Sequence, residues 1–400
     1  MLPLLPLPLT TQVFLVVLAL GAASAALLAR ELFRTRVARA LLAAAYVIPA
    51  IGLALWDAGR EPWAALGVRL AWTGLIVLAP AAALLFVAAL IFRGLAALRR
   101  GLAALRRPRP AARVPPAPDG SRRALVQASL SVLPAAAASA SLRGLTNAPD
   151  EPRVRLVRMR FRGLHPDLEG LRILQLSDLH LGVSKRVEHL EASLRRVAPL
   201  APDLIVLTGD VADDLGELKA ALDAVHRHRP RLGAFAALGN HEYLHDIRRT
   251  RPLYEQSPVP LLVDRGVTLS VGRARLHIAG ADDPVVLGGE GLWRALERSV
   301  ARCRDGAPDD AFRLLLCHRP EGFRAAAERG FHLTLAGHTH GGQIGLLGRS
   351  AFQSLWPEDY LWGTYTRGES RLYTTSGFGH WFPFRLGCPT EAPIIVLERA

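Results

Sequence analysis

Five short polar motifs stand in one stretch of the sequence, and each follows an apolar, strand-like run. In chain order they read Asp178-Leu179-His180, Gly209-Asp210, Gly239-Asn240-His241-Glu242, Cys317-His318 and Gly337-His338-Thr339-His340-Gly341-Gly342. Asp, Asn and His supply the oxygen and nitrogen ligands that divalent metals prefer, and strands that end together deliver such side chains to one point. The motifs therefore predict a two-metal hydrolase.

The spacing inside two motifs indicates how the ligands are presented. Asp178 and His180 are one residue apart, so an extended backbone would point both side chains to the same face. His338 and His340 repeat this spacing, and the glycines around them permit tight backbone turns. We expect each pair to face a common point.

The order and identity of the five motifs resemble the calcineurin-like metallophosphoesterase superfamily, whose signature runs D-x-H, G-D, G-N-H-[DE], a lone His and then G-H-x-H. The resemblance covers roughly residues 153 to 399. Residues 170–177, before the first block, and Gly341-Gly342-Gln343, after the last, are similar to a bacterial membrane-associated or exported branch. The resemblance implies an α/β fold of two facing sheets flanked by helices, with the metals at the strand ends.

The resemblance also implies a role for each site residue. One divalent ion would take Asp178, His180, Asp210 and His340, and the other would take Asp210, Asn240, His318 and His338. Asp210 would then bridge the two ions, and a bridging hydroxide would attack the phosphorus. His241 would stay off the metals and act as the general acid. This nitrogen and oxygen set fits Mn²⁺, Fe²⁺ or Zn²⁺ better than Mg²⁺, and the choice among the three stays open.

Single matches of this kind also have structural explanations, and it is their joint occurrence that favours a site. Three neighbouring features keep two interpretations each. Asp282-Asp283 is either a further block of this branch or a solvated turn, and Cys317 is either a core thiol or a soft metal ligand. His380 follows a glycine turn and either contacts substrate or is structural.

Apolar runs and helix-period segments alternate from Val154 onward, which indicates α/β layers. The pattern predicts an edge strand over 154–161 and further strands at 171–176, 204–207, 234–238, 275–279, 312–317, 331–336, 372–375 and 394–397. It predicts helices at 189–198, 217–228 and 292–303.

The formal charge of +14 is concentrated outside this region. Residues 1–150 carry 16 Arg against 5 acidic residues, whereas residues 151–400 are almost balanced, with 33 basic and 30 acidic. All 13 histidines lie between His165 and His380. We therefore expect the metal chemistry in the C-terminal part and no nucleic-acid partner.

Apolar stretches in the first 143 residues predict a transmembrane region of about four helices. They are Thr11–Ala29, Ala38–Trp56, Val68–Phe92 and a weaker fourth, Ala124–Leu142. Arginines cluster in the first and third loops, which places those loops in the cytoplasm and the following domain outside. The fourth stretch follows Arg122-Arg123 and also resembles a cleavable twin-arginine export signal, or it is an Ala-rich linker helix that leaves the domain inside.

These inferences predict a membrane region over 1–143, a linker over 144–152 and a metallophosphoesterase domain over 153–400. We expect a multi-pass protein of the bacterial cytoplasmic membrane whose external domain hydrolyses phosphate esters or diesters, with a lipid or envelope component as substrate. Two alternatives stay open. One is a cytoplasmic-face pyrophosphatase acting on a nucleotide-linked lipid, and the other is a catalytically silent metal-binding scaffold.

Overall fold

The computed structural model describes residues 143, 151–182, 185–283, 289–355, 360–380 and 385–400. The chain separates into two compact units, Met1–Leu145 and Thr146–Ala400. The four predicted transmembrane segments and most of the predicted linker lie outside the described residues. Within the described part of the chain, no helix has the length and apolar character needed to cross a bilayer.

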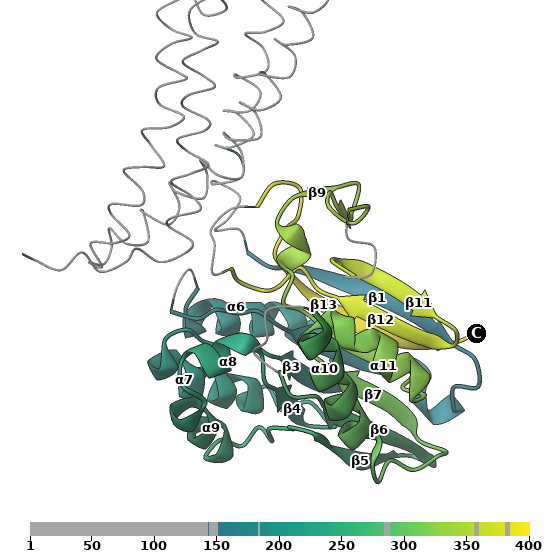
Figure 1. Cartoon of the computed structure of the whole chain (residues 1–400). Coiled ribbons are helices and arrows are strands. Elements are labelled where there is room, and N and C mark those ends of the chain that lie inside the picture. The colour runs from purple at the N-terminus through teal and green to yellow at the C-terminus, as the bar shows by residue number, and fades with distance from the viewer. Residues whose placement is uncertain (1–142, 144–150, 183–184, 284–288, 356–359, 381–384) are drawn as a thin grey trace, which may run out of the picture. The chain divides into compact units, whose positions relative to one another are not determined.

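The second unit contains two large mixed β-sheets (Figure 1). The strand order of the first is β1-β13-β2-β3-β4, and that of the second is β11-β12-β8-β7-β6-β5. The bounds in the first sheet are β1 Arg153–Phe161, β13 Glu391–Arg399, β2 Arg172–Leu176, β3 Leu204–Thr208 and β4 Ala234–Ala237. Those in the second are β11 Gly363–Arg367, β12 Ser370–Thr374, β8 Leu333–Ala336, β7 Phe312–Leu316, β6 Ala274–Gly280 and β5 Arg265–Val271. The predicted α/β two-sheet fold is confirmed.

Parallel pairing sets where the strands end. Strands β2, β3 and β4 run parallel to one another, and so do β6, β7, β8 and β12. Antiparallel pairs occur at β13–β2, β11–β12 and β5–β6. Since parallel neighbours end at the same edge of a sheet, the loops after β2, β3 and β4 emerge together, as do those after β7 and β8.

The side-chain alternation of the strands builds the core. Ile173 and Val206 point to the inner face, where they join Leu276, Leu314 and Leu335 of the second sheet in one buried cluster. Strands buried on both faces read as continuous apolar runs rather than alternating ones. That property explains why these strands could be predicted from the sequence.

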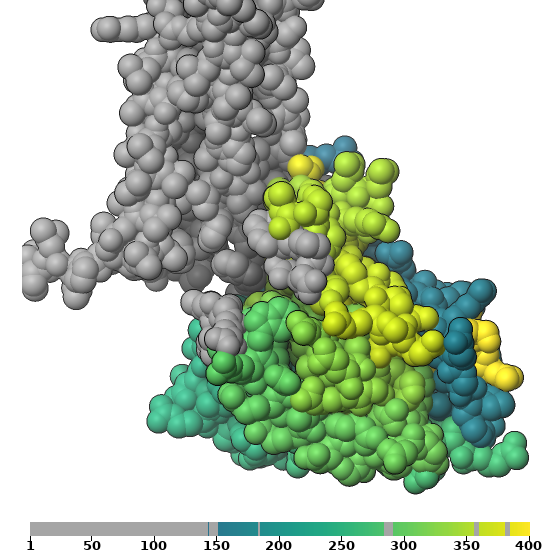
Figure 2. Space-filling model, turned by 45° about the vertical axis from the view of Figure 1, so that its right-hand side comes forward, coloured from purple at the N-terminus to yellow at the C-terminus, as the bar shows by residue number. Residues whose placement is uncertain are grey.

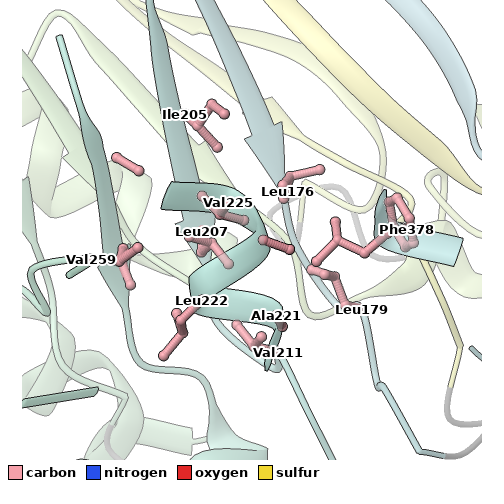
Figure 3. Close-up of a cluster of buried hydrophobic side chains, with 14 of the residues drawn as sticks. Leu176, Leu179, Ile205, Leu207, Val211, Ala221, Leu222, Val225, Val259 and Phe378 are labelled. Carbon is pink, nitrogen blue, oxygen red and sulfur yellow. The ribbon is translucent and has the colours of Figure 1, made fainter. Parts of the chain in front are cut away.

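Helices cover both outer faces. On the first sheet, α6 (Val187–Val197) and α7 (Leu215–Arg227) bring Leu190 and Leu222 into one buried cluster with Leu207. Figure 3 shows Leu222 and Leu207 in this cluster. Asp214 is the N-cap of helix α7, and its side chain accepts a hydrogen bond from the Gly216 amide at 2.9 Å. On the second sheet lie α10 (Gly289–Arg304) and α11 (Phe323–Glu328).

Several short elements were not predicted. They are strands β5 and β11, helices α8 (Asn240–Leu244), α9 (Ile247–Glu255) and α11, and a hairpin of β9 (Gly345–Leu346) and β10 (Arg349–Ser350). Most of them are short or carry glycine or proline, and α9 contains Pro252. Local propensity is weak there, and contacts with the sheets decide the conformation.

Candidate metal centre

Every predicted ligand lies just after the end of a parallel strand. Asp178 follows β2, Asp210 follows β3, and Asn240 begins the helix after β4. On the second sheet, His318 follows β7 and His338 follows β8. The fold therefore brings residues from distant parts of the chain to one edge of the sandwich.

One group of buried side chains could hold a cation between Asp178, His180 and His340. The His180 and His340 Nε2 atoms lie 3.2 Å apart, and His340 Nε2 lies 3.4 Å from Asp178 Oδ1. His180 Nε2 also lies 3.7 Å from Asp210 Oδ2. These four residues are the ones expected at the first ion.

A second group contains Asp210, His318 and His338. His318 Nε2 lies 3.2 Å from Asp210 Oδ2 and 3.2 Å from Asn240 Oδ1. The same Asp210 oxygen thus faces an imidazole from each group. The seven predicted ligands are brought close together, and Asp210 lies between the two groups.

The backbone that presents these ligands differs from the expected one. The residues Asp178, His180, Asp210, His338 and His340 all have positive φ, between 46° and 68°. The expectation that an extended backbone aligns the two ligands of each pair is therefore wrong. Left-handed conformations at non-glycine residues store strain and occur at functional sites, where the surrounding fold enforces them.

Two glycines leave room for the ligands. A Cβ atom at Gly209 would lie 2.6 Å from His318 Nδ1, and one at Gly337 would overlap Oδ2 of Asp178 and the Ser177 hydroxyl. Any side chain at either position would displace a ligand. The glycines of the G-D and G-H-x-H motifs are thus required by close approach.

Hydrogen bonds orient two of the imidazoles. His318 Nδ1 donates to the Thr208 carbonyl oxygen at 2.8 Å, and His180 Nδ1 donates to Asp213 Oδ2 at 3.0 Å. Each bond leaves the Nε2 atom facing the centre. This is the arrangement by which proteins fix the tautomer of a metal-ligating histidine.

The charges of the cluster fit a divalent cation. Asp178 is fully buried, and its Oδ2 atom has no hydrogen-bond partner. Burial raises the pKa of Asp178, and this effect outweighs the nearby imidazoles, which lower it. Burial would raise the pKa of Asp210 as well, but the charge and hydrogen bond of His318 lower it. A bare carboxylate oxygen beside imidazole nitrogens is a donor set that accepts Mn²⁺, Fe²⁺ or Zn²⁺.

Both histidines of the G-H-x-H motif face an arginine. Arg385 Nη2 donates to His340 Nδ1 at 3.1 Å, and Arg319 Nη1 lies 3.2 Å from His338 Nε2. Burial first, and then nearby positive charges, lower the pKa of both imidazoles well below its usual value. The two rings are therefore neutral, which is the form that binds metal.

Sequence reasoning missed Asp213, which accepts hydrogen bonds from three imidazoles. His241 Nδ1 lies 2.6 Å from Asp213 Oδ1, His245 Nε2 lies 2.9 Å from the same oxygen, and His180 Nδ1 contacts the other oxygen. Burial would lower the pKa of His241, but the bond with Asp213 and the nearby carboxylates raise it to about 9. The feature of the sequence that could have indicated Asp213 is its position three residues after Asp210.

Replacing Asp213 by asparagine should lower turnover by about 10- to 100-fold, the usual effect of losing a carboxylate that orients site histidines. The amide would present N–H groups to at least one imidazole N–H. His245→Ala is the matched control, because it removes one partner of Asp213 and leaves the contacts of His180 and His241 in place. Equal activity of Asp213→Asn and the unsubstituted chain, at full metal occupancy, would contradict this role.

Glu242 is the second residue to which sequence reasoning gave no role. Its buried carboxylate accepts hydrogen bonds from the backbone amides of Asp210, Val211 and Gly239 at 2.7–3.0 Å, and from the Tyr254 hydroxyl at 3.2 Å. One side chain thus ties the loop after β3 to the loop after β4. Both loops carry predicted ligands.

Glu242→Ala is expected to destabilise the fold by about 3 to 5 kcal/mol, because three buried amides lose their acceptor and each such loss costs about 1 to 3 kcal/mol. The melting temperature measures this loss. The matched control is Glu255→Ala, which removes an exposed carboxylate from α9. A Glu242→Ala variant with the same melting temperature as the control would show that these hydrogen bonds do not stabilise the loops.

The structure decides two of the three features that kept two interpretations. Cys317 is buried, its Sγ donates to the Arg319 carbonyl, and burial raises the pKa of its thiol. Among the described residues, the groups that could hold a metal do not include it. Asp283 is buried in an ion pair with Arg319 Nε at 2.9 Å, so it is not part of a solvated turn. His380 is buried, and its contact with substrate stays untested.

A pocket of about 320 Å³ opens over the second group. Its lining consists of Asp210, Asn240, His241, His338, Thr339, His340, Gly342 and Gln343. The volume lies at the lower end of the range for small-molecule sites. His241 therefore faces the space in which a bound phosphate group would sit next to the ligands.

A two-sheet α/β sandwich that gathers buried carboxylates and imidazoles in this way defines the metallophosphoesterase class. The family model of the calcineurin-like phosphoesterases matches residues 171–342, and relatives named as metallophosphoesterases support the same superfamily. The match starts just before β2 and ends at Gly342, the last residue of the G-H-x-H-G-G motif, so it includes all seven predicted ligands and His241.

Three relatives illustrate the range of the family. An uncharacterized metallophosphoesterase of Campylobacter jejuni is 31% identical over 64% of this chain and 65% of its own length. A transmembrane protein with metallophosphoesterase domain from Bos taurus is 31% identical over 65% of this chain and 60% of its own. The phosphodiesterase YaeI of Escherichia coli is 27% identical over 69% of this chain and 99% of its own. The chain thus spans less than two thirds of the first two relatives.

Proposed function

We propose that this protein is a membrane-anchored phosphoesterase that uses two divalent metal ions to hydrolyse phosphate esters or diesters. One observation carries the proposal: a single carboxylate oxygen of Asp210 faces two groups of ligand-type side chains, 3.7 Å from His180 Nε2 and 3.2 Å from His318 Nε2. A bridging carboxylate between two nitrogen-rich groups is what a dinuclear site requires.

The proposed ligands divide into two sets that share Asp210. Asp178, His180 and His340 complete the first set, and Asn240, His318 and His338 complete the second. Bound there, the two ions would supply an activated water as nucleophile and neutralise the charge on the phosphoryl oxygens. The chain itself holds the ligands in fixed tautomers and excludes bulk water by burying them.

His241 is the proposed general acid. It lines the pocket, and Asp213 holds its Nδ1 atom at 2.6 Å, which leaves Nε2 available to the leaving-group oxygen. Asp213 stabilises the protonated ring, as the raised pKa of about 9 reflects. A proton delivered to the departing alkoxide would lower the barrier of the P–O cleavage.

The proposed anchor is the apolar region within residues 1–143, with four spans and the catalytic unit outside the bacterial cytoplasmic membrane. Its support is the length of the apolar stretches and the distribution of arginines. Relatives from Bos taurus and Danio rerio carry the word transmembrane in their names. A substrate in the membrane or envelope is consistent with such an anchor.

Hydrolysis assays with the full chain test the proposal. After loading with Mn²⁺, Fe²⁺ or Zn²⁺, the protein should release p-nitrophenol from bis(p-nitrophenyl) phosphate, and a chelator should abolish the release. A folded, metal-loaded chain with no turnover of monoesters, diesters or pyrophosphates would instead support the scaffold alternative. Accessibility of engineered surface cysteines from each side of the membrane separates an external enzyme from a cytoplasmic-face pyrophosphatase.

A further inference from the structure

The β9–β10 hairpin exposes leucines where a soluble protein avoids them. Leu346 is 71% exposed and Leu347 is 95% exposed, and Leu355, shortly after the hairpin, is 66% exposed. Figure 1 shows the β9 segment standing off the two large sheets, and the yellow-green atoms of this part of the chain project from the surface in Figure 2. Single exposed leucines are ordinary, but two successive ones at a tip are a candidate contact surface.

The turn conformation makes this choice of residue more unusual. Leu346 pairs with Arg349, so Leu347 and Gly348 form a two-residue loop. Their φ angles are +53° and +79°, as in a type I′ turn. Asn, Asp and Gly favour the first position of such a turn, whereas leucine disfavours a positive φ. A leucine at position 347 is thus unfavourable both for the backbone conformation and for solvation. This indicates that Leu347 serves a role other than stabilising the fold.

The hairpin is firmly attached beside the pocket. The Gly345 amide donates to the Leu386 carbonyl at 2.8 Å, the Leu386 amide donates to the Gln343 carbonyl at 3.0 Å, and Ala351 bonds Ile344. Gln343 lines the pocket. A partner that binds the tip of the hairpin therefore lies a few residues from the proposed reaction site.

The charge of Arg349 and the short linker before β1 favour a lipid surface as the partner of the hairpin. Arg349, at the base of the turn, is exposed and forms no ion pair with any described residue, so its guanidinium is available to lipid phosphates. The last predicted span ends at Leu142 and β1 begins at Arg153. The residues between them reach at most about 35 Å when fully extended, at about 3.3 to 3.6 Å each. A catalytic unit on so short a tether stays close to the bilayer.

We propose that Leu346 and Leu347 form a membrane-inserting lip, which docks the mouth of the pocket on an anionic lipid surface and presents lipid phosphate esters to the site. The docking rests on the exposed hairpin, on Arg349 and on the short linker after the last predicted span. The consequence for substrates rests on the proposed phosphoesterase function.

Fluorescence of the full chain in vesicles tests the docking. Leu347→Cys is labelled with an environment-sensitive dye, in vesicles of phosphatidylcholine and phosphatidylglycerol with and without nitroxide-labelled lipid. Asp305→Cys is the matched control, since it is exposed in the loop before β7 and thus at the opposite edge of the sheet from the hairpin. The unsubstituted chain is the blank, because its three cysteines are buried.

The lip predicts a blue shift and nitroxide quenching at position 347 and neither at position 305. Equal, water-like emission at both positions would overturn it. A blue shift that disappears when the protein is diluted among more vesicles would overturn it in favour of contact with a second copy of the chain.

The double variant Leu346→Asn/Leu347→Asn tests the consequence for substrates, because asparagine accepts the positive φ and keeps the turn. Turnover of phosphatidic acid or phosphatidylglycerol in vesicles should fall by at least about tenfold, from the lost burial of two leucines. Turnover of bis(p-nitrophenyl) phosphate should not change. An equal fall for both kinds of substrate would overturn the lipid presentation. Absence of all turnover before substitution would refute the proposed function, while the fluorescence still decides the docking.

Discussion

Asp210→Asn should reduce turnover of any phosphate ester by at least about a thousandfold. The substituted amide would keep the shape of the side chain but would lose the negative charge between His180 Nε2 and His318 Nε2. A loss of about 4 kcal/mol in stabilising two adjacent cations corresponds to about three factors of ten in rate. The measurement is kcat for bis(p-nitrophenyl) phosphate at saturating Mn²⁺, together with the metal content of the purified chain.

Asp214→Asn is the matched control for this substitution. Asp214 directly follows Asp213, is exposed, and caps helix α7 through the Gly216 amide. Asparagine caps a helix about as well as aspartate does, so this variant should keep both its melting temperature and its turnover. If Asp210→Asn were folded and retained turnover within a few-fold of this control, Asp210 would not be a bridging ligand.

His241→Ala should show an effect that depends on the leaving group. A general acid contributes about 10²- to 10⁴-fold when the departing oxygen needs a proton. Loss of His241 should therefore slow the release of a simple alcohol by about that factor. Release of p-nitrophenolate, which leaves without protonation, should fall much less. The measurement is kcat across a series of esters with leaving groups of increasing pKa.

His245→Ala provides the comparison, because His245 also donates to Asp213 but does not line the pocket. It should show no dependence on the leaving group. If His241→Ala slowed all esters by the same factor, His241 would act in binding or in positioning rather than as an acid. That result would remove the general-acid assignment and leave the metal ligands unaffected.

The candidate ligands could be recognised in the sequence because they stand in short local motifs. Asp178, Asp210 and His318 each end an apolar run, and such runs identify buried parallel strands whose ends meet. The partition of the seven residues into two metal-binding sets is what the family resemblance implies, and the structure brings their side chains close together. The residues that gather at the candidate site could therefore be named from the sequence, and their role as ligands stays a prediction.

The geometry around the ligands could not be predicted in the same way. An extended D-x-H segment was the natural expectation from spacing, but Asp178 and His180 have φ of +52° and +46°. Those angles are unfavourable for each residue taken alone, and only close packing enforces them. Arg385, which donates to His340, lies 45 residues away and belongs to no motif. The role of Asp213 could not be predicted either, because the three histidines that donate to it come close only in the folded chain.

Electron paramagnetic resonance of the Mn²⁺-loaded full chain tests the two-metal centre most directly, and it requires no substrate. We predict two ions per chain and the spectrum of a magnetically coupled pair, because ions that share one carboxylate lie about 3.5 to 4 Å apart. Asp210→Asn should weaken or abolish the coupling. One ion per chain with the six-line signal of isolated Mn²⁺ would contradict the account.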